Sequence, residues 1–134
     1  MSRVLVFGTF DLFHKGHEFF LSQARLFGSE LYAVIALDET VKTIKSRLPV
    51  HSQDVRLRSV SAHVDKAVLG RRGDKYAIIE EIRPQVIVLG YDQSFFVDKL
   101  EGELERRGVD CVIVRVSESY LPHIFKSSLL REKQ

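Results

Sequence analysis

Two histidines three positions apart, His14 and His17, are the residues of this sequence best suited to chemistry on a phosphate. Residues 14–17 read HKGH, and they follow residues 8–11, which read GTFD. Two imidazoles that face one anion can stabilise the charge that develops on phosphoryl oxygens during in-line displacement. Gly16 lies between them and lacks a Cβ, so a phosphate or a backbone segment can approach closely. The pattern indicates a phosphate-transfer site.

The spacing of the two histidines alone leaves other interpretations open. They could be surface residues or half of a metal site. A zinc site would need further Cys, His or carboxylate ligands, and His51, His63 and His123 have no ligand-like spacing. A site that binds only a metal is therefore the weaker hypothesis.

The elements that must hold this pair are indicated by an alternation of apolar runs and mixed segments. Five short apolar runs are expected to be strands: Val4 to Phe7, Leu31 to Leu37, Ala67 to Leu69, Val86 to Leu89 and Val109 to Val116. Because these runs are mostly continuously hydrophobic, helices should cover both faces of a parallel sheet. The predicted fold class is α/β, a Rossmann-like, doubly wound, parallel five-stranded sheet with helices on both faces.

Four helices are expected in the segments between these strands. They are His17 to Phe27, Ser52 to about His63, Lys75 to Ile82 and Val97 to Arg107. In the first, apolar residues recur at helical spacing and Gly28 supplies a stop. Ser52 and Asp74 are predicted N-caps. Residues 127–131 could form one more short helix.

The histidine pair falls where an open parallel sheet collects ligands. Ligands bind at the carboxyl ends of the strands, and the positive end of the following helix attracts phosphate. The first predicted strand ends at Phe7, and the helix after it should begin near Gly16 or His17. The loop between them is therefore well placed to bind phosphate.

Composition excludes several classes of function. The 134 residues, 45% hydrophobic and 28% charged, fit a single domain over residues 1–134. The formal net charge is only +2, from 20 basic and 18 acidic residues, so no nucleic-acid partner is expected. No apolar run approaches bilayer length, so no membrane partner is expected either. The single cysteine, Cys111, has the setting of a buried strand residue and favours a reducing, cytoplasmic location.

The GTFD and HKGH segments together resemble the signature of the cytidylyltransferase-like nucleotidyltransferase superfamily. Residues 38–42, 64–70 and 88–93 also resemble blocks of this family, so the similarity spans nearly the whole chain. The archaeal FAD synthases are the branch it resembles most, and the glycerol-3-phosphate cytidylyltransferases come next.

This resemblance implies roles for individual residues. His14 and His17 would contact the triphosphate and stabilise the transition state, while Thr9 and Phe10 would line the nucleotide pocket through main-chain contacts. The other expected nucleotide contacts are Lys15, Gly16, Asp92, Ser127 and Ser128. Asp92 could instead be a turn residue. The two serines match the family's C-terminal motif only in part, and either could be an N-cap.

Basic residues after the second predicted strand are the expected contacts for phosphate of the donor or acceptor. Arg56 is the first choice, because its place on a helix resembles the family arrangement and a guanidinium suits bidentate phosphate contact. Lys42 is the second, with Lys45 and Arg47 as alternatives. Asp11 could cap the loop or help to place a divalent ion, and local sequence favours capping.

The resemblance implies a nucleotidyltransferase whose substrates remain open at this stage. The leading hypothesis is transfer of AMP from ATP to FMN, giving FAD and pyrophosphate, with Mg²⁺ or a similar divalent cation bridging the phosphates. A second hypothesis is a CTP-dependent enzyme acting on glycerol 3-phosphate or another small phosphorylated alcohol. A third is a nucleotide-binding module without turnover. A homodimer is also implied, and no protein ligand set for a metal is assigned.

Overall fold

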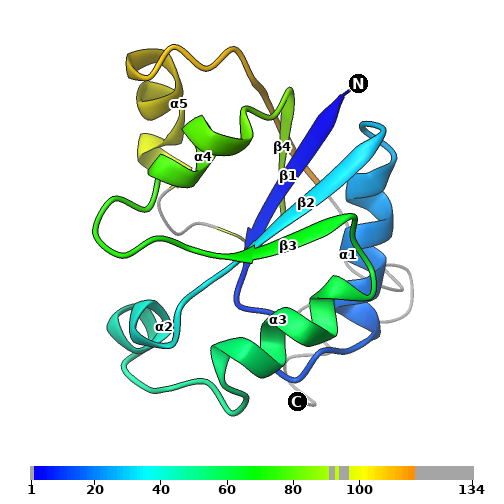
Figure 1. Ribbon diagram of the computed structural model, residues 1–134, viewed down its shortest axis with the longest axis vertical. Helices are drawn as coiled ribbons and strands as arrows, with labels where there is room; N and C mark the ends of the chain where they lie inside the picture. Colours follow the sequence, from blue (N-terminus) through cyan, green and yellow to red (C-terminus); the bar gives the residue numbers. More distant parts are fainter. Residues whose placement is uncertain (1, 91–92, 94–96, 117–134) are drawn as a thin grey trace.

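A central parallel sheet organises the chain, as Figure 1 shows for the computed structural model, which describes residues 2–90, 93 and 97–116. The strands are β1 (Arg3–Gly8), β2 (Glu30–Ile35), β3 (Lys66–Leu69), β4 (Val86–Leu89) and β5 (Val112–Arg115). Their order is β3-β2-β1-β4-β5, and every neighbouring pair is parallel. β1 is therefore central, and the direction of winding reverses between β1 and β4.

Helices cover both faces of this sheet. They are α1 (Lys15–Arg25), α2 (Asp38–Lys45), α3 (Gln53–Ser61), α4 (Ala77–Ile82) and α5 (Val97–Arg106). Figure 1 shows α4 and α5 on one side of the strands and α1 on the other. α3 packs into the same hydrophobic core as α1. The predicted doubly wound α/β fold is confirmed.

Alternate side chains of β1 enter two separate cores. Val4 and Val6 pack with residues of α1 and α3, whereas Leu5 and Phe7 pack with residues of α4 and α5. Val4, Leu5 and Val6 are completely buried. A strand that is covered on both faces must be apolar at successive positions. This explains why β1 is a continuous apolar run and does not alternate between apolar and polar residues.

Several helix boundaries differ from those predicted. α1 begins at Lys15, two residues early, because the side chain of His14 caps it. α2 was not predicted, and its N-cap Leu37 has no side chain that could signal a helix start. α4 begins at Ala77 and not at Lys75, since Asp74 accepts a hydrogen bond from the amide of Tyr76 (3.1 Å) in the turn before the helix.

The last predicted strand is shorter than expected, and the prediction for Cys111 was wrong. β5 begins at Val112 because the chain first turns through Gly108, whose φ is 68°. Cys111 precedes the strand and is half-buried. Burial raises the pKa of its thiol to about 11, so the thiol is protonated at neutral pH. The predicted helix at residues 127–131 lies outside the described residues.

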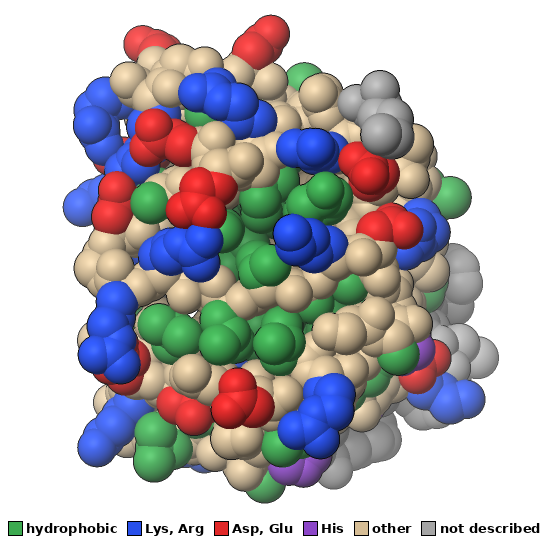
Figure 2. Space-filling view, in the orientation of Figure 1, with side chains coloured by type: hydrophobic (Ala, Val, Ile, Leu, Met, Phe, Trp, Pro, Cys, Tyr) green, Lys and Arg blue, Asp and Glu red, His purple; other side chains and the backbone are tan. Residues whose placement is uncertain are grey.

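The charges on one face of the molecule are mixed. Figure 2 shows basic and acidic side chains interspersed on this face, with hydrophobic side chains gathered near its centre. Such interspersed charges do not build the strong positive potential that non-specific nucleic-acid binding needs. Within residues 2–90, 93 and 97–116, no helix combines the length and apolar character needed to cross a membrane.

Candidate active site

The loop between β1 and α1 has a strained backbone. Phe10 (φ 53°) and Leu12 (φ 51°) both lie in the left-handed region that L-residues rarely adopt. The ring of Phe10 is buried over Gly8, where a Cβ would come within 2.6 Å of it. Such backbone conformations cost about 1–3 kcal/mol each and persist where surrounding structure fixes them. The contacts that hold this loop are therefore central to the site.

The two predicted catalytic histidines lie against each other at the start of α1. Their ring centroids are 3.9 Å apart and the planes are inclined by 22°. Nδ1 of His14 accepts a hydrogen bond from the amide of Gly16 (3.0 Å), and Nδ1 of His17 accepts one from the amide of His14 (3.2 Å). The histidine side chains thus form a capping box for the helix.

These hydrogen bonds decide which nitrogen of each ring can donate. An Nδ1 that accepts a hydrogen bond carries no proton, so the proton of the neutral ring is on Nε2. Burial lowers the pKa of His17 to about 4, with a further lowering from the charge of His14. At neutral pH, His17 is therefore an uncharged ring with an Nε2–H donor.

Gly16 leaves room for the ring of His14. A Cβ at Gly16 would lie 2.8 Å from Cε1 and 3.0 Å from Nδ1 of His14. Any larger residue would push that ring out of its capping position. The close approach expected at Gly16 is therefore made, in this structure, by the ring of His14.

Aromatic rings surround His17 on its protein side. The ring of Phe10 meets it edge-on at 5.4 Å, and the ring of Phe13 lies at 5.3 Å. Phe13 in turn stacks on His63 at 4.8 Å. These apolar contacts limit the rotation of the His17 ring and remove water from it, which is the physical cause of its lowered pKa.

Asp11 joins the β1–α1 loop to the loop between α2 and α3. Its carboxylate accepts hydrogen bonds from the amides of Val50 (2.8 Å) and His51 (2.9 Å). Burial opposes ionisation, but the bonds from His51 and Val50 outweigh it and lower the pKa of Asp11. Of the two roles left open for Asp11, these contacts match capping of a loop, although the loop is the one 39 to 40 residues away.

Arg56 is completely buried beneath this loop. Its Nη1 donates to the carbonyl oxygens of Thr9 (2.9 Å) and Ala36 (2.8 Å), and its Nε donates to that of His51 (3.0 Å). Its Nη2 bonds Oδ1 of Asp38 at 2.6 Å. This placement differs from the phosphate contact expected from the sequence, because the guanidinium faces protein acceptors in the interior.

The other basic residues expected to contact phosphate are exposed. Lys42, Lys45 and Arg47 lie on α2 or just after it, and Lys15 lies at the first position of α1. The charge of Lys45 contributes to the lowered pKa of His17. The positive charge of Lys45 on α2 therefore acts on the ring of His17.

A second set of contacts joins the carboxyl ends of β1 and β4, where the winding reverses. The side chain of Gln93 donates from Nε2 to the carbonyl oxygen of Phe7 (3.1 Å) and accepts at Oε1 from the amide of Gly90 (3.1 Å). Arg115 of β5 donates to the carbonyl oxygens of Gly90 (2.7 Å) and Gln93 (2.8 Å). These bonds connect the carboxyl ends of β1, β4 and β5 next to the β1–α1 loop.

The structure therefore brings together most, but not all, of the predicted site. Thr9, Phe10, His14, Lys15, Gly16 and His17 share one loop and helix start. Three expected nucleotide contacts, Asp92, Ser127 and Ser128, lie outside the described residues. In the part of the chain that the structure describes, no group of three or more His, Cys, Asp or Glu side chains could hold a metal ion.

Sequence reasoning missed three residues that build the site. Asp38 pairs with the buried arginine, Gln53 accepts from the amide of Asp38 (2.8 Å), and Gln93 links the strand ends. For Asp38 a signal existed, since it follows the second apolar run and so had to lie at the carboxyl end of the sheet. Gln53 carries no comparable signal, and for Gln93 the only signal is its place in the block 88–93 that resembles the family.

Several relatives with similar sequences are FAD synthases. The FAD synthase of Methanosarcina acetivorans is 48% identical over 118 residues, which cover 87% of this chain and 77% of the relative. The FAD synthase of Methanothrix thermoacetophila is 44% identical over 135 residues, which cover 99% and 93% of the two chains. The FAD synthase of Aciduliprofundum boonei is 42% identical over 120 residues, covering 88% and 80%.

A solved structure with a similar fold is the lipopolysaccharide core biosynthesis protein from Thermoplasma volcanium. It is 36% identical to this chain with a TM-score of 0.81, and the match covers 87% of this chain and 97% of that one. The family model described as cytidylyltransferase-like matches residues 5–133. The resemblance noted in the GTFD and HKGH segments is thereby confirmed: this chain belongs to the cytidylyltransferase-like family of nucleotidyltransferases.

Proposed function

We propose that this protein transfers AMP from ATP to FMN, giving FAD and pyrophosphate. The observation that carries the proposal is its similarity to FAD synthases, at 48% and 44% identity over 87% and 99% of the chain. The geometry at the end of β1 is of the kind such a transfer requires. It holds two histidines whose Nε2 atoms are available as donors.

The reaction is a phosphoryl-centred substitution. A phosphate oxygen of FMN attacks the α-phosphorus of ATP, the bond from that phosphorus to the bridging oxygen breaks, and pyrophosphate leaves with the electron pair. We infer that Nε2 of His14 and Nε2 of His17 donate hydrogen bonds to the phosphoryl oxygens as charge builds up there. No covalent intermediate with the protein is needed.

The nucleotide is proposed to bind along the β1–α1 loop. Main-chain groups of Thr9 and Phe10 would line its pocket, and Lys15 and Gly16 at the first turn of α1 would meet the phosphates. Asp92, Ser127 and Ser128 remain proposed contacts. Among the basic residues, Lys45 is favoured by its electrostatic influence on His17, and Lys42 lies one turn earlier on the same exposed helix.

A divalent cation, Mg²⁺ in the simplest case, would neutralise charge on the triphosphate. The carboxylates near the histidine pair are engaged elsewhere, Asp11 with two amides and Asp38 with Arg56. Mg²⁺ is commonly held by substrate phosphates and few protein ligands. We therefore infer that the cation enters with the nucleotide. Removal of the cation with a chelator should abolish turnover, and added Mg²⁺ should restore it.

Pyrophosphate release, measured over a matrix of donors and acceptors, tests the proposal. ATP and CTP should each be combined with FMN and with glycerol 3-phosphate, and FAD should be identified by chromatography. We expect product only from ATP with FMN. CMP transfer to glycerol 3-phosphate would replace the proposal by the alternative reaction. Tight ATP binding without pyrophosphate from any acceptor would indicate a nucleotide-binding module.

ATP should also bind more tightly than CTP. A pocket that bonds the adenine edge through main-chain groups leaves those groups unpaired with cytosine, which can cost about 1–3 kcal/mol for each buried group. Calorimetric titration of the Mg²⁺ complexes measures the difference. Tighter binding of CTP would contradict the assignment of the donor.

We further infer a homodimer that acts in the cytoplasm as one domain over residues 1–134. The dimer is inferred from the family resemblance. The cytoplasmic location is inferred from the single cysteine, which cannot form a disulfide within the chain and so suits a reducing compartment. Light scattering at concentrations well above micromolar would show a dimer. A monomer there would remove this inference and leave the transfer reaction untouched.

A further inference from the structure

We propose that Arg56 is a positioning residue for nucleotidyl transfer, a proposal that rests on the function proposed above. In this role the guanidinium touches no substrate. It fixes three loops relative to one another, so that the histidine pair and the lysines of α2 face the same triphosphate.

The partners of Arg56 come from three separate segments of the chain. Thr9 follows β1, Ala36 follows β2, and His51 precedes α3. All three offer main-chain carbonyl oxygens at 2.8–3.0 Å. A carbonyl cannot turn away without moving its backbone, so each hydrogen bond fixes the local path of the chain. The side chain has no exposed surface, and burying a charge in this way is tolerated only with such partners.

The peptide unit of His51 is held from both sides. Its carbonyl oxygen accepts from Nε of Arg56 (3.0 Å), and its amide donates to Asp11 (2.9 Å). Arg56 also holds Thr9, just before the strained residues Phe10 and Leu12. The loop is thus anchored at Thr9 and at Asp11, on both sides of Phe10, which is one of the two residues of this loop with positive φ. This is the kind of surrounding structure that a strained loop needs in order to persist.

Arg56 also positions α2. Asp38 is the first residue of that helix, and it is bound at its carboxylate by Arg56 (2.6 Å) and at its amide by Gln53 (2.8 Å). Both holding residues belong to α3. α2 carries Lys42 and Lys45. The guanidinium of Arg56 therefore fixes both the loop before the histidines and the first residue of the helix that carries these lysines.

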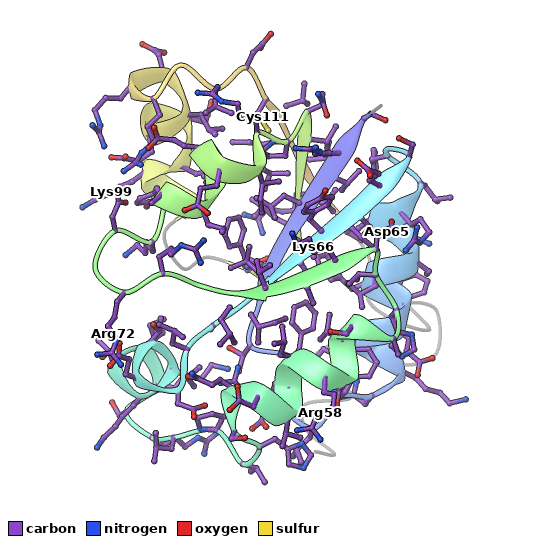
Figure 3. The ribbon with its side chains drawn as sticks, viewed as in Figure 1. Arg58, Asp65, Lys66, Arg72, Lys99 and Cys111 are labelled. Carbon is purple, nitrogen blue, oxygen red and sulfur yellow. The ribbon has the colours of Figure 1, made fainter. Side chains whose placement is uncertain are left out.

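The decisive experiment compares Arg56→Lys with Arg58→Lys. Arg58 lies two residues later on α3 and is exposed, so it is a matched control for charge and helix position (Figure 3). A lysine at position 56 keeps the positive charge but lacks the fork that reaches four acceptors. We expect Arg56→Lys to lower kcat/KM for ATP on the order of 10- to 100-fold, because small displacements of catalytic groups have effects of that size. Arg58→Lys should match the wild type.

A second readout separates positioning from direct contact with phosphate. Amide resonances of residues 9–14 and 38–45 should shift in Arg56→Lys when no nucleotide is present. If Arg56 contacted only phosphate, those resonances would stay in place in the free protein while ATP affinity fell, and the proposal would be overturned. Wild-type kcat and KM in a folded Arg56→Lys protein would overturn it as well.

If Arg56→Lys does not fold, Asp38→Ala decides the question. That change leaves the three carbonyl bonds of Arg56 and removes its side-chain partner on α2. Shifted resonances in α2 with a lower ATP affinity would support the proposal, and wild-type values for both would overturn it. ATP affinity is measured by calorimetry without FMN, so the outcome stands even if FMN is not the acceptor.

Discussion

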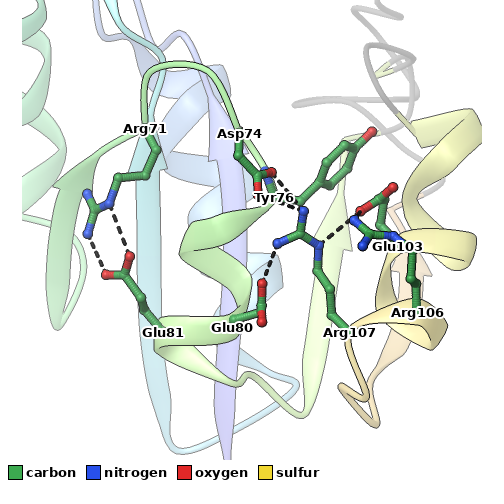
Figure 4. Close-up of polar contacts among 8 residues, drawn as sticks. All are labelled: Arg71, Asp74, Tyr76, Glu80, Glu81, Glu103, Arg106 and Arg107. Atoms are coloured by element: carbon green, nitrogen blue, oxygen red, sulfur yellow. Dashed lines mark hydrogen bonds and ion pairs between the residues drawn. The ribbon is translucent and has the colours of Figure 1, made fainter.

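Two arginines hold opposite sides of the sheet, and they do so with different kinds of partner. Arg56 is bonded to three main-chain carbonyls and one carboxylate. Arg107, in the turn just after α5, is bonded to three carboxylates: those of Asp74 (2.8 Å), Glu103 (2.9 Å) and Glu80 (Figure 4). These bonds, led by that from Asp74, raise the pKa of Arg107.

The difference in partners indicates a difference in task. A main-chain carbonyl cannot move without moving its backbone, so the hydrogen bonds of Arg56 fix the path of the loops. Carboxylates end flexible side chains, and those around Arg107 are 23–52% exposed. Water and salt can replace such partners. The network of Arg107 therefore fastens α5 to α4 and to the turn before α4, and we expect the chemistry not to depend on it.

The largest effect is expected at the histidine pair, on the Arg56 side of the comparison. His17→Ala should lower kcat by about 100-fold or more, because one preorganised donor to a developing charge is typically worth that much. His14→Ala should lower kcat to a similar extent. Steady-state pyrophosphate release measures the rate, and circular dichroism checks that each variant is folded. Near-normal rates in both folded variants would show that the chemistry lies elsewhere.

Removing the other arginine should affect stability and spare the rate. Arg107→Met keeps an unbranched stem and leaves three carboxylates facing one another, so the urea midpoint should fall while kcat and KM stay near their wild-type values. High salt should narrow the gap in midpoint between variant and wild type. A fall in rate as large as that expected for Arg56→Lys would abolish the distinction between the two networks.

Acid should weaken the two regions in different pH ranges. His17 has its pKa lowered from 6.5 to about 4, so the unfolded chain binds a proton before the folded one does as pH falls. The free energy of unfolding should therefore drop by about 1–2 kcal/mol between pH 7 and pH 4, a value reduced for the partial exposure of the ring. Urea titrations of wild type and His17→Gln should differ in this range.

The carboxylates near Arg107 act at lower pH. Hydrogen bonds from Arg107 lower the pKa of Asp74 from 3.8, and those from Arg106 and Arg107 lower that of Glu103 from 4.5. Their contribution is present above those ordinary values and is lost as pH falls below them. Arg107→Met should therefore change the acid dependence only below about pH 4.5. A change near neutral pH would contradict this assignment.

Within the proposed site, the smallest change in kinetics is expected at Asp11, because its carboxylate is engaged with two loop amides. Asp11→Asn keeps one carbonyl oxygen and so retains a bond to one of the two amides, at Val50 or His51. KM for ATP should rise by a factor of a few, with kcat little changed. If the variant were as inactive as His17→Ala, the carboxylate of Asp11 would have to act on the substrate or its cation.

Local sequence signals predicted the parts of the fold that depend on neighbouring residues. The strand Val86–Leu89 was placed correctly because a fully buried strand is apolar at every position. The helix start at Ser52 was also correct, since its hydroxyl caps the amide of Val55. α2 was missed because the amide of its first residue, Asp38, is bonded by Gln53, which lies 15 residues away in sequence. No residue close to Asp38 in the sequence indicates that bond.

The same limit applies within the site. The HKGH segment and its loop are contiguous, so a phosphate-transfer role could be predicted for them from residue types. The direction of the Arg56 side chain could not, because its acceptors lie up to 47 residues away in sequence. An arginine on a helix is usually exposed, and only the fold shows that this one meets four acceptors in the interior.

The position of β1 in the middle of the sheet has a consequence for synthesis of the chain. Val4 of β1 pairs with Val86 of β4, so one edge of β1 has no neighbouring strand until 82 further residues have been synthesised. At ribosomal speeds that wait is roughly 4–16 s. Thr9, Asp11, the histidine pair, Asp38, His51 and Arg56 all precede β3 and share the half of the sheet made first. All residues of the half that carries the proposed site are thus synthesised before the half fastened by Arg107 is complete.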